Sequence, residues 1–150
     1  MLWLGEGGLI IEPVFAAEYT ASEEELARLG LFAGEMVYRI SRLRREDSQL
    51  RAEDVRLPCA LFPGLLHKDV FTDISALAEM YGLALGDATE RISLDLAPPE
   101  IAKALHIQED KKVLTVARVV HLKDGRPAQW RTSYSLDRDG FAKLEDLLRR

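Results

Sequence analysis

Hydrophobic and polar positions alternate over short stretches of the chain, in a pattern that predicts strands interrupted by short helices. In the first half, three ranges rich in β-branched and aromatic residues are predicted as strands: 9–19, 36–44 and 50–57. After the first range, Ser22 and Glu25 have the spacing of a capping box, and Gly30 stands where a helix ends in the left-handed conformation. The polar residues 45–49 join the last two strands as a hairpin, so the predicted order is strand, helix, strand, strand.

The second half of the chain repeats this order. A short helix is predicted from Pro98 to Leu105, with a proline tolerated in its first turn. Strands are predicted over three ranges: 88–96, 113–122 and 127–136. A constant offset of 76 positions relates six pairs of identical residues: Ala21/Ala97, Glu24/Glu100, Leu29/Leu105, Val37/Val113, Arg42/Arg118 and Ala52/Ala128. We therefore predict a duplicated β-α-β-β unit.

Two such units predict an α+β fold, in which an antiparallel sheet of about six strands carries helices packed on it. Between the repeats, residues 72–82 place Ile74, Leu77 and Ala78 at helical spacing, and residues 141–150 have a similar apolar stripe. Both ranges are predicted as helices. Because the 150 residues contain no low-complexity linker, we predict a single domain over residues 1–150.

Composition restricts the function without naming it. Hydrophobic residues make up 47% of the chain and charged residues 30%, as in an ordinary globular domain. The formal net charge of -5 argues against a domain that binds nucleic acid by electrostatic attraction to the phosphate backbone. The start of the chain has no signal-peptide pattern, and the longest uncharged apolar run, 57–66, is broken by two prolines. We therefore expect no membrane association and a cytoplasmic location.

The sequence offers little for catalysis or metal binding. Three isolated histidines lack a second ligand at metal-binding spacing: His67, His106 and His121. The single Cys59 is predicted to be a small packing residue, and the Gly-rich residues 5–8 a loose terminus, since no phosphate-loop context surrounds them. Residues 137–139 are predicted as a turn before the last helix. We accordingly predict no catalytic residue, no metal and no cofactor.

Charged side chains within the predicted strands stand out from this background. Arg42 and Arg44 are two positions apart, so they share a sheet face with the apolar Tyr38 and Ile40, and Arg118 repeats Arg42 in the second unit. In the last strand four polar residues share one face, opposite Trp130 and Tyr134: Gln129, Arg131, Ser133 and Ser135.

Guanidinium groups on an apolar face need an anionic partner, because an unpaired buried charge is costly. Two explanations are open at this point. In the first, the partner is the carboxylate or phosphate of a ligand. In the second, no ligand is involved, and the arginines pair with Glu53 and Asp54 or extend along the apolar surface until their charged ends reach solvent.

An ordered series of motifs then resembles a known family. The motifs are GEMVYRISRLR at 34–44, EDVRLP at 53–58, FPGL at 62–65, YG at 81–82, KVL at 112–114 and DGRP at 124–127. Together they resemble the UTRA domain, the effector-binding module of the HutC-like branch of GntR-family bacterial transcription regulators. The resemblance covers residues 19–137.

The resemblance implies a chorismate lyase-like fold and a domain that forms a homodimer and binds a small metabolite. It also implies that DNA is contacted only through a winged-helix domain on the N-terminal side, outside this chain, so that the chain is either an excised part of a longer regulator or a free-standing module. In the family the Arg-x-Arg pair, here Arg42 and Arg44, meets the anionic group of the effector. Glu53 and Thr72 belong to the same surroundings.

The last strand departs from the family pattern Glu-x-Ser-x-Ser-x-Tyr. Gln129 replaces the glutamate, Arg131 replaces a serine and Ser135 replaces the closing tyrosine. These departures make family members that bind amino-sugar phosphates a poor template. A third guanidinium favours a more anionic effector, such as a di-acid or a carboxylate metabolite. The predicted ligand-binding residues are Arg42, Arg44, Glu53, Thr72, Gln129, Arg131, Ser133 and Ser135.

Two other functions compete with a ligand-binding regulatory domain. The shared fold alone suggests an enzyme of the chorismate lyase type, for which Glu53 is the one pocket-face residue able to act as an acid or base. The other alternative is a dimerisation module without a working pocket, in which the arginines form ion pairs. We favour the regulatory domain because it explains the in-strand arginines and the acidic net charge together.

Overall fold

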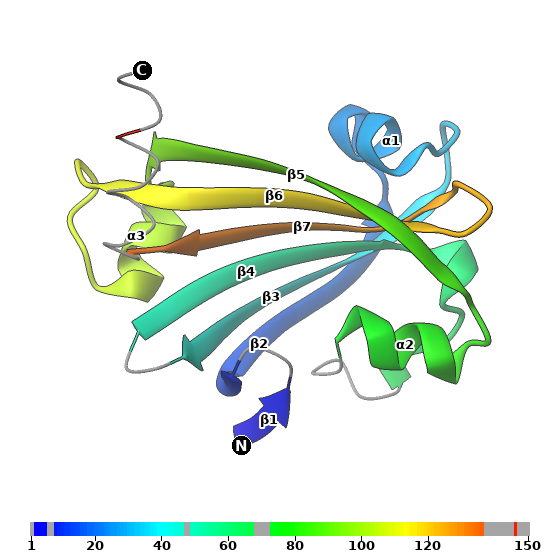
Figure 1. Ribbon diagram of the computed structural model, residues 1–150, viewed down its shortest axis with the longest axis horizontal. Coiled ribbons are helices and arrows are strands. Elements are labelled where there is room, and N and C mark those ends of the chain that lie inside the picture. Colours follow the sequence, from blue (N-terminus) through cyan, green and yellow to red (C-terminus); the bar gives the residue numbers. More distant parts are fainter. Residues whose placement is uncertain (1, 6–7, 47–48, 68–72, 137–145, 147–150) are drawn as a thin grey trace.

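The computed structural model describes residues 2–5, 8–46, 49–67, 73–136 and 146. Over this part of the chain, seven strands form one sheet in the order β1-β2-β3-β4-β7-β6-β5, and every neighbouring pair is antiparallel (Figure 1). The strands are β1 (Leu2–Gly5), β2 (Gly8–Thr20), β3 (Met36–Glu46), β4 (Gln49–Pro58), β5 (Leu85–Leu96), β6 (Lys112–Leu122) and β7 (Pro127–Ser135). The helices are α1 (Glu23–Leu29), α2 (Ile74–Met80) and α3 (Pro99–Leu105), with 3₁₀ turns η1 (Cys59–Leu61) and η2 (Leu65–His67).

The predicted α+β class and all six predicted strands are confirmed. The sheet has a seventh strand, β1, which the sequence analysis missed. The interpretation of residues 5–8 as a loose terminus was wrong for Gly5 and Gly8, because they pair with each other where β1 turns into β2. A strand of four residues next to glycines is too short to give a periodic signal. The predicted turn at 137–139 lies outside the described residues, and so does the predicted helix at 141–150 apart from residue 146.

The two repeats are visible in the topology. α1 and α3 are related by 76 positions at both ends, and so are β3 and β6. The units β2-α1-β3-β4 and β5-α3-β6-β7 meet at the centre of the sheet, where β4 pairs with β7. The last strands of both repeats therefore lie side by side, and residues from each repeat share the middle of each sheet face.

Local signals explain where the helices begin and end. In α1 the Ser22 hydroxyl accepts a hydrogen bond from the Glu25 backbone N–H at 3.2 Å, and Glu25 accepts one from the Ser22 N–H at 2.8 Å, so the predicted capping box is confirmed. Gly30 ends α1 in the left-handed region, at φ 62°. His106 ends α3 with φ 58°, which makes this histidine a cap residue. α2 begins at Ile74, two residues after the predicted start, because Asp73 caps it.

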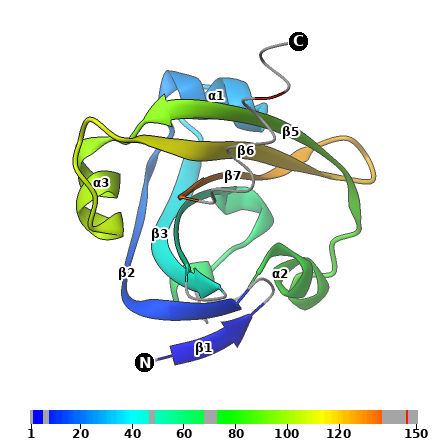
Figure 2. The same ribbon diagram turned by 60° about the vertical axis from the view of Figure 1, so that its left-hand side comes forward.

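The helices cover opposite faces of a strongly curved sheet (Figure 2). On one face, hereafter the α1/α3 face, Leu29 of α1 packs against Val37 and Trp130 of the sheet. Ala102 and Leu105 of α3 pack against Ala52 and Val113 on the same face. On the other face, hereafter the α2 face, eight residues join α2 and the 3₁₀ turns to the strands: Tyr38, Ile40, Val55, Leu57, Phe62, Leu65, Ile74 and Leu77. The α2 face also carries the arginines that the sequence analysis singled out.

Candidate functional site

A buried carboxylate shared by three arginines lies on the α2 face. Arg42 on β3 is directly across from Glu53 on β4, and its Nε donates a hydrogen bond to Glu53 Oε1 at 2.9 Å. The Arg44 Nε lies 3.1 Å from the same oxygen. From the second repeat, the Arg131 Nη1 lies 3.8 Å from Glu53 Oε2. The Arg42 and Glu53 side chains are only 2% and 1% exposed, so this charge cluster is part of the protein interior.

Burial and the neighbouring charges shift the pKa of Glu53 in opposite directions. Burial alone would raise the pKa of this carboxyl group, but the guanidinium groups of Arg42, Arg44 and Arg131 outweigh it and hold the pKa below its ordinary value. Burial lowers the pKa of Arg131, Glu53 opposes that shift, and the neighbouring arginines add to it. The neighbouring guanidinium groups therefore favour the ionised form of Glu53, and positive charge is gathered around a single carboxylate.

Seven of the eight predicted ligand-binding residues come together here. In the register of β4 with β7, Ser133 lies across from Glu53 and Arg131 across from Val55, which continues the same face. Gln129, Ser133 and Ser135 are buried. Within the described part of the chain, neither Gln129 Oε1 nor Glu53 Oε2 has a hydrogen-bond partner. The eighth predicted residue, Thr72, lies outside the described residues.

The structure decides part of the question about partners that the sequence left open. Glu53 is the protein partner of Arg42 and Arg44. The alternative that Asp54 pairs with these arginines was wrong, because successive residues of a strand point to opposite faces. Asp54 lies on the α1/α3 face, where it pairs with Arg39 and Arg56.

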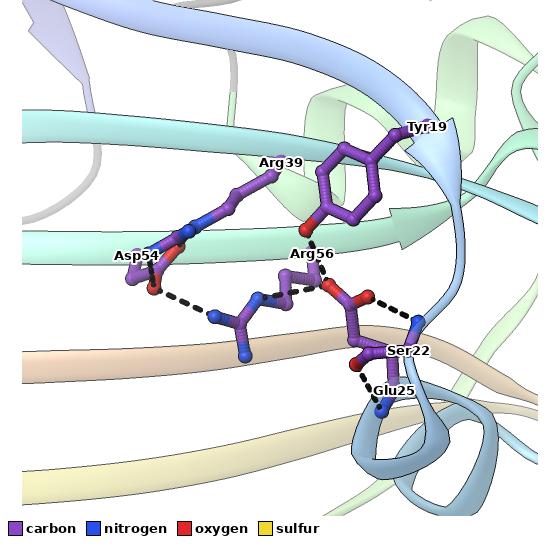
Figure 3. A network of polar contacts seen from close by, with 6 residues as sticks. All are labelled: Tyr19, Ser22, Glu25, Arg39, Asp54 and Arg56. Carbon is purple, nitrogen blue, oxygen red and sulfur yellow. Dashed lines mark hydrogen bonds and ion pairs between the residues drawn. The ribbon is translucent and has the colours of Figure 1, made fainter.

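A second polar network on the α1/α3 face holds α1 to the sheet (Figure 3). Arg39 donates two hydrogen bonds to Asp54, from Nε to Oδ1 at 3.0 Å and from Nη2 to Oδ2 at 2.9 Å. Arg56 bridges the network, because its Nη2 lies 3.1 Å from Asp54 Oδ2 and its Nε lies 3.1 Å from Glu25 Oε2. The Tyr19 hydroxyl donates to the same Glu25 oxygen at 2.5 Å. Only the Ser22 and Glu25 part of this network was predictable from spacing.

The buried Glu25 carboxylate and its partners shift one another's pKa values. Burial would raise its pKa, but hydrogen bonds from Ser22 and Tyr19 and the charge of Arg56 lower it below the ordinary value. Burial and the contact with Glu25 raise the pKa of Tyr19 to about 12. The Arg56 guanidinium also lies 4.5 Å from the ring centroid of Trp130, which adds a cation–π contact to the ion pairs.

Two cavities open on the α1/α3 face. The larger, about 740 Å³, lies beside α3, and its lining includes Leu43, Ile101 and Tyr134. The smaller, about 500 Å³, lies beside α1 over Trp130. Both have the size of a pocket for a small metabolite.

Other chemistry is sparse in the described residues. They contain no group of three or more His, Cys, Asp or Glu residues placed to hold a metal ion. Cys59 is half-buried, and burial and the neighbouring Glu18 carboxylate raise the pKa of its thiol to about 12, which disfavours the reactive thiolate. None of the helices described is long and apolar enough to cross a bilayer.

Comparison with known proteins agrees with this architecture. The chain is similar to the ligand-binding domain of a GntR-family transcriptional regulator from Bordetella bronchiseptica, with 28% identity, a TM-score of 0.74, and coverage of 85% of this chain and 83% of that one. The effector domain of PhnF from Mycobacterium smegmatis has the same fold at 21% identity and a TM-score of 0.73, with 84% and 77% covered. So does the C-terminal domain of a GntR-family regulator from Bacillus anthracis, at 23% identity and a TM-score of 0.68, with 87% and 92% covered.

The family itself is given by the sequence match. The UTRA domain family matches residues 14–137, which is most of the chain and covers both repeats except the first residues of β2. The match includes all the described residues of the arginine and glutamate cluster and of the network around Asp54 and Glu25. The chain therefore belongs to the UTRA domain family, the effector-binding domains of GntR-family transcription regulators.

Proposed function

We propose that this domain binds a small anionic metabolite on the α2 face and controls, as a homodimer, the DNA binding of a winged-helix domain attached on its N-terminal side. The 150 residues would then be one effector domain, working in the cytoplasm, where its DNA target lies. The eight residues predicted from the sequence form the proposed site, with Arg131 as its most distinctive member. The effector would lie among them and would contact residues of both repeats.

One observation carries the proposal: three guanidinium groups surround the single carboxylate of Glu53 in the protein interior. Arg131 is the farthest of the three, at 3.8 Å, and its Nε has no hydrogen-bond partner among the described residues. Arginine pairs most strongly with planar, bidentate acceptors such as carboxylate, and phosphate is also bound this way. An anionic effector would supply the acceptor that Arg131 lacks.

The position of Arg131 suggests how binding could be transmitted. Arg131 lies across from Val55, and its neighbour Trp130 lies across from Arg56 on the opposite face. Arg56 in turn holds Glu25 of α1. An effector that prefers one arrangement of β4 and β7 would therefore bias the position of α1. Such coupling is typically about 1–3 kcal/mol, which corresponds to a roughly 5–150-fold change in operator affinity.

Membership of a family of regulatory domains argues against the alternative function as an enzyme of the chorismate lyase type. The family is non-enzymatic, so the prediction that this chain is not an enzyme is confirmed, and no acid or base role is assigned to Glu53. The dimerisation module without a working pocket is the alternative that an experiment must exclude.

A thermal-shift screen of the chain against small anionic metabolites tests the proposal. Ligand that binds only the native state raises the melting temperature once it exceeds its dissociation constant. We expect hits among carboxylates, lost in Arg42→Ala and Arg131→Ala but kept in Arg126→Ala, whose exposed side chain pairs within its own loop. If no anion raises the melting temperature while both cluster variants are less stable than wild type, the arginines are structural and the pocket proposal is wrong.

The regulatory half of the proposal needs the attached DNA-binding domain. In a regulator carrying this domain, a hit from the screen should change operator affinity within the range given above, and Arg131→Ala should abolish that change while leaving operator binding intact. Light scattering of the chain alone should give twice the monomer mass of 16.9 kDa. A monomer at micromolar concentration would contradict the proposed homodimer.

A further inference from the structure

The two hairpins that carry the arginines differ in one cross-strand pair. In the first repeat, Arg42 on β3 lies across from Glu53 on β4. In the second, Arg118 follows Arg42 by 76 positions on β6, and it lies across from Arg131 on β7. The repeat offset alone would place Gln129 there, but the register of β6 with β7 is displaced by two residues. Two guanidinium groups therefore face each other where the first repeat has an ion pair.

This arrangement leaves two positive charges poorly compensated. Like charges directly across from each other destabilise an antiparallel pair. The Arg131 side chain is 21% exposed and the Arg118 side chain 36%, so solvent screens them only in part. Arg131 lies 3.8 Å from Glu53 Oε2, and Arg118 lies 3.7 Å from Glu90 Oε1, so both contacts are beyond hydrogen-bond distance.

The Nε atoms of both arginines strengthen this conclusion. Each is shielded from solvent, and neither has a hydrogen-bond acceptor among the described residues. A buried donor without an acceptor costs free energy, most of all on a charged group. The first repeat illustrates the arrangement that satisfies such a donor, because Arg42 Nε donates to the carboxylate across from it at 2.9 Å.

We propose that the Arg118–Arg131 pair binds the anionic group of the effector, a carboxylate or a phosphate, in the role that Glu53 has opposite Arg42. The inference rests on the proposed function and deepens it, because it adds Arg118 to the site and assigns different tasks to the arginines. Arg42 and Arg44 hold Glu53, whereas Arg118 and Arg131 hold the ligand. Glu53 then limits the charge of the site, so that one anionic group binds there.

Gln129 indicates a second property of the ligand. Its side chain is buried on the same face as Arg131, and its Oε1 accepts no hydrogen bond from the described residues. Residues two apart on a strand are separated by about 7 Å, so a hydrogen-bond donor this far from the anionic group would reach Gln129. The ligand class is therefore a small carboxylic or phosphoric acid that also carries a hydroxyl or ammonium group.

Chemical shifts of the arginine Nε–H groups, measured by nuclear magnetic resonance, report which arginines contact a bound anion. The chain is titrated with malonate and, separately, with inorganic phosphate, at an ionic strength matched with chloride. We expect saturable shifts of the Nε–H signals of Arg118 and Arg131, assigned by their loss in Arg118→Gln and Arg131→Gln. The Arg42 signal should stay in place, because its Nε already donates to Glu53. The probe with the lower dissociation constant identifies carboxylate or phosphate as the group recognised.

Affinities and melting temperatures of the variants separate a ligand contact from a structural role. Arg118→Gln and Arg131→Gln should each weaken binding of the better probe by roughly tenfold or more, the effect of losing a charge-assisted hydrogen bond. Arg126→Gln, a matched control in the same hairpin, should bind like wild type. Without anion, Arg118→Gln should melt no lower than wild type, because it removes a like-charge contact.

The outcomes are distinguishable. Saturable shifts at Arg42 and Arg44 alone, with wild-type affinity in Arg118→Gln, would overturn the assignment of Arg118 and leave the anionic effector site in place. A lower melting temperature of Arg118→Gln without anion, together with unchanged affinity, would make Arg118 structural and overturn it as well. No saturable shift at any arginine with either probe would contradict the anionic site itself.

Discussion

Arg42 and Glu53 lie directly across from each other on β3 and β4, joined by a hydrogen bond of 2.9 Å in a part of the protein that solvent scarcely reaches. A buried ion pair of this kind adds little net stability, because the attraction between the charges is offset by the cost of removing both from water. Loss of one partner is different, since the other is left charged and buried. The cluster is therefore sensitive to single substitutions.

Glu53→Gln tests this asymmetry. Because it leaves the buried guanidinium of Arg42 without its carboxylate, we expect a loss of about 3–5 kcal/mol in the free energy of unfolding. Urea denaturation measures it. Glu90→Gln is the matched control, because Glu90 is half-exposed and lies 3.7 Å from Arg118, and it should change stability by less than about 1 kcal/mol. Equal losses in both variants would contradict the structural role of Glu53.

The lowered pKa of Glu53 predicts a pH dependence of stability. A carboxyl group whose pKa is lower in the folded protein than in the unfolded chain stabilises the fold above its ordinary pKa, here 4.5. That contribution is lost as the pH falls from about 4.5 through the folded-state value. Melting temperatures measured from pH 7 to pH 3 should therefore fall less steeply in Glu53→Gln than in wild type. Parallel profiles would contradict the prediction.

Much of the fold could be predicted because its signals are local. The capping box at Ser22 and Glu25 and the strand composition of the two hairpins depend on neighbouring residues only, and the structure confirms them. The 76-residue offset noticed in the sequence also agrees with the structure, because it relates α1 to α3 and β3 to β6. Period-two alternation placed Arg42 and Arg44 on one face with Tyr38, as observed.

What could not be predicted depends on pairing between distant strands. The pairing of β4 with β7 brings Arg131 to Glu53, and a two-residue change of register places Arg131 across from Arg118. Neither relationship leaves a trace in local spacing, because register is set by the turn and by packing of the whole sheet. The contact of Arg56 with Glu25 likewise joins residues of different elements. The sequence thus identified the charged residues of the site but not which charges meet.

The network that holds α1 predicts a graded response at Glu25. Glu25→Gln keeps an acceptor for the Ser22 N–H but removes the charge that Tyr19 and Arg56 contact, so we expect a loss of about 1–2 kcal/mol in the free energy of unfolding. Glu25→Ala also removes the acceptor and should cost about 1 kcal/mol more. Urea denaturation gives both values.

Glu24 supplies the control for this series, because it is the exposed neighbour of Glu25 in the first turn of the same helix. Glu24→Gln should change the free energy of unfolding by less than about 0.5 kcal/mol. If Glu24→Gln and Glu25→Gln were equally destabilised, the contacts of Glu25 with Tyr19 and Arg56 would contribute nothing to stability.

The single cysteine allows a test of the α2 face by chemical modification. Burial, and the nearby Glu18 carboxylate, raise the pKa of the Cys59 thiol to about 12, and only the thiolate reacts with iodoacetamide. At pH 8 the native protein should therefore be alkylated at least roughly tenfold more slowly than the same chain in urea, where the thiol has an ordinary pKa. Glu18→Gln should speed alkylation of the native protein, because it removes the negative charge beside the thiol, while Glu23→Gln on α1 should not. Mass spectrometry follows the single modification, and equal rates in the native and unfolded protein would contradict the environment described for Cys59.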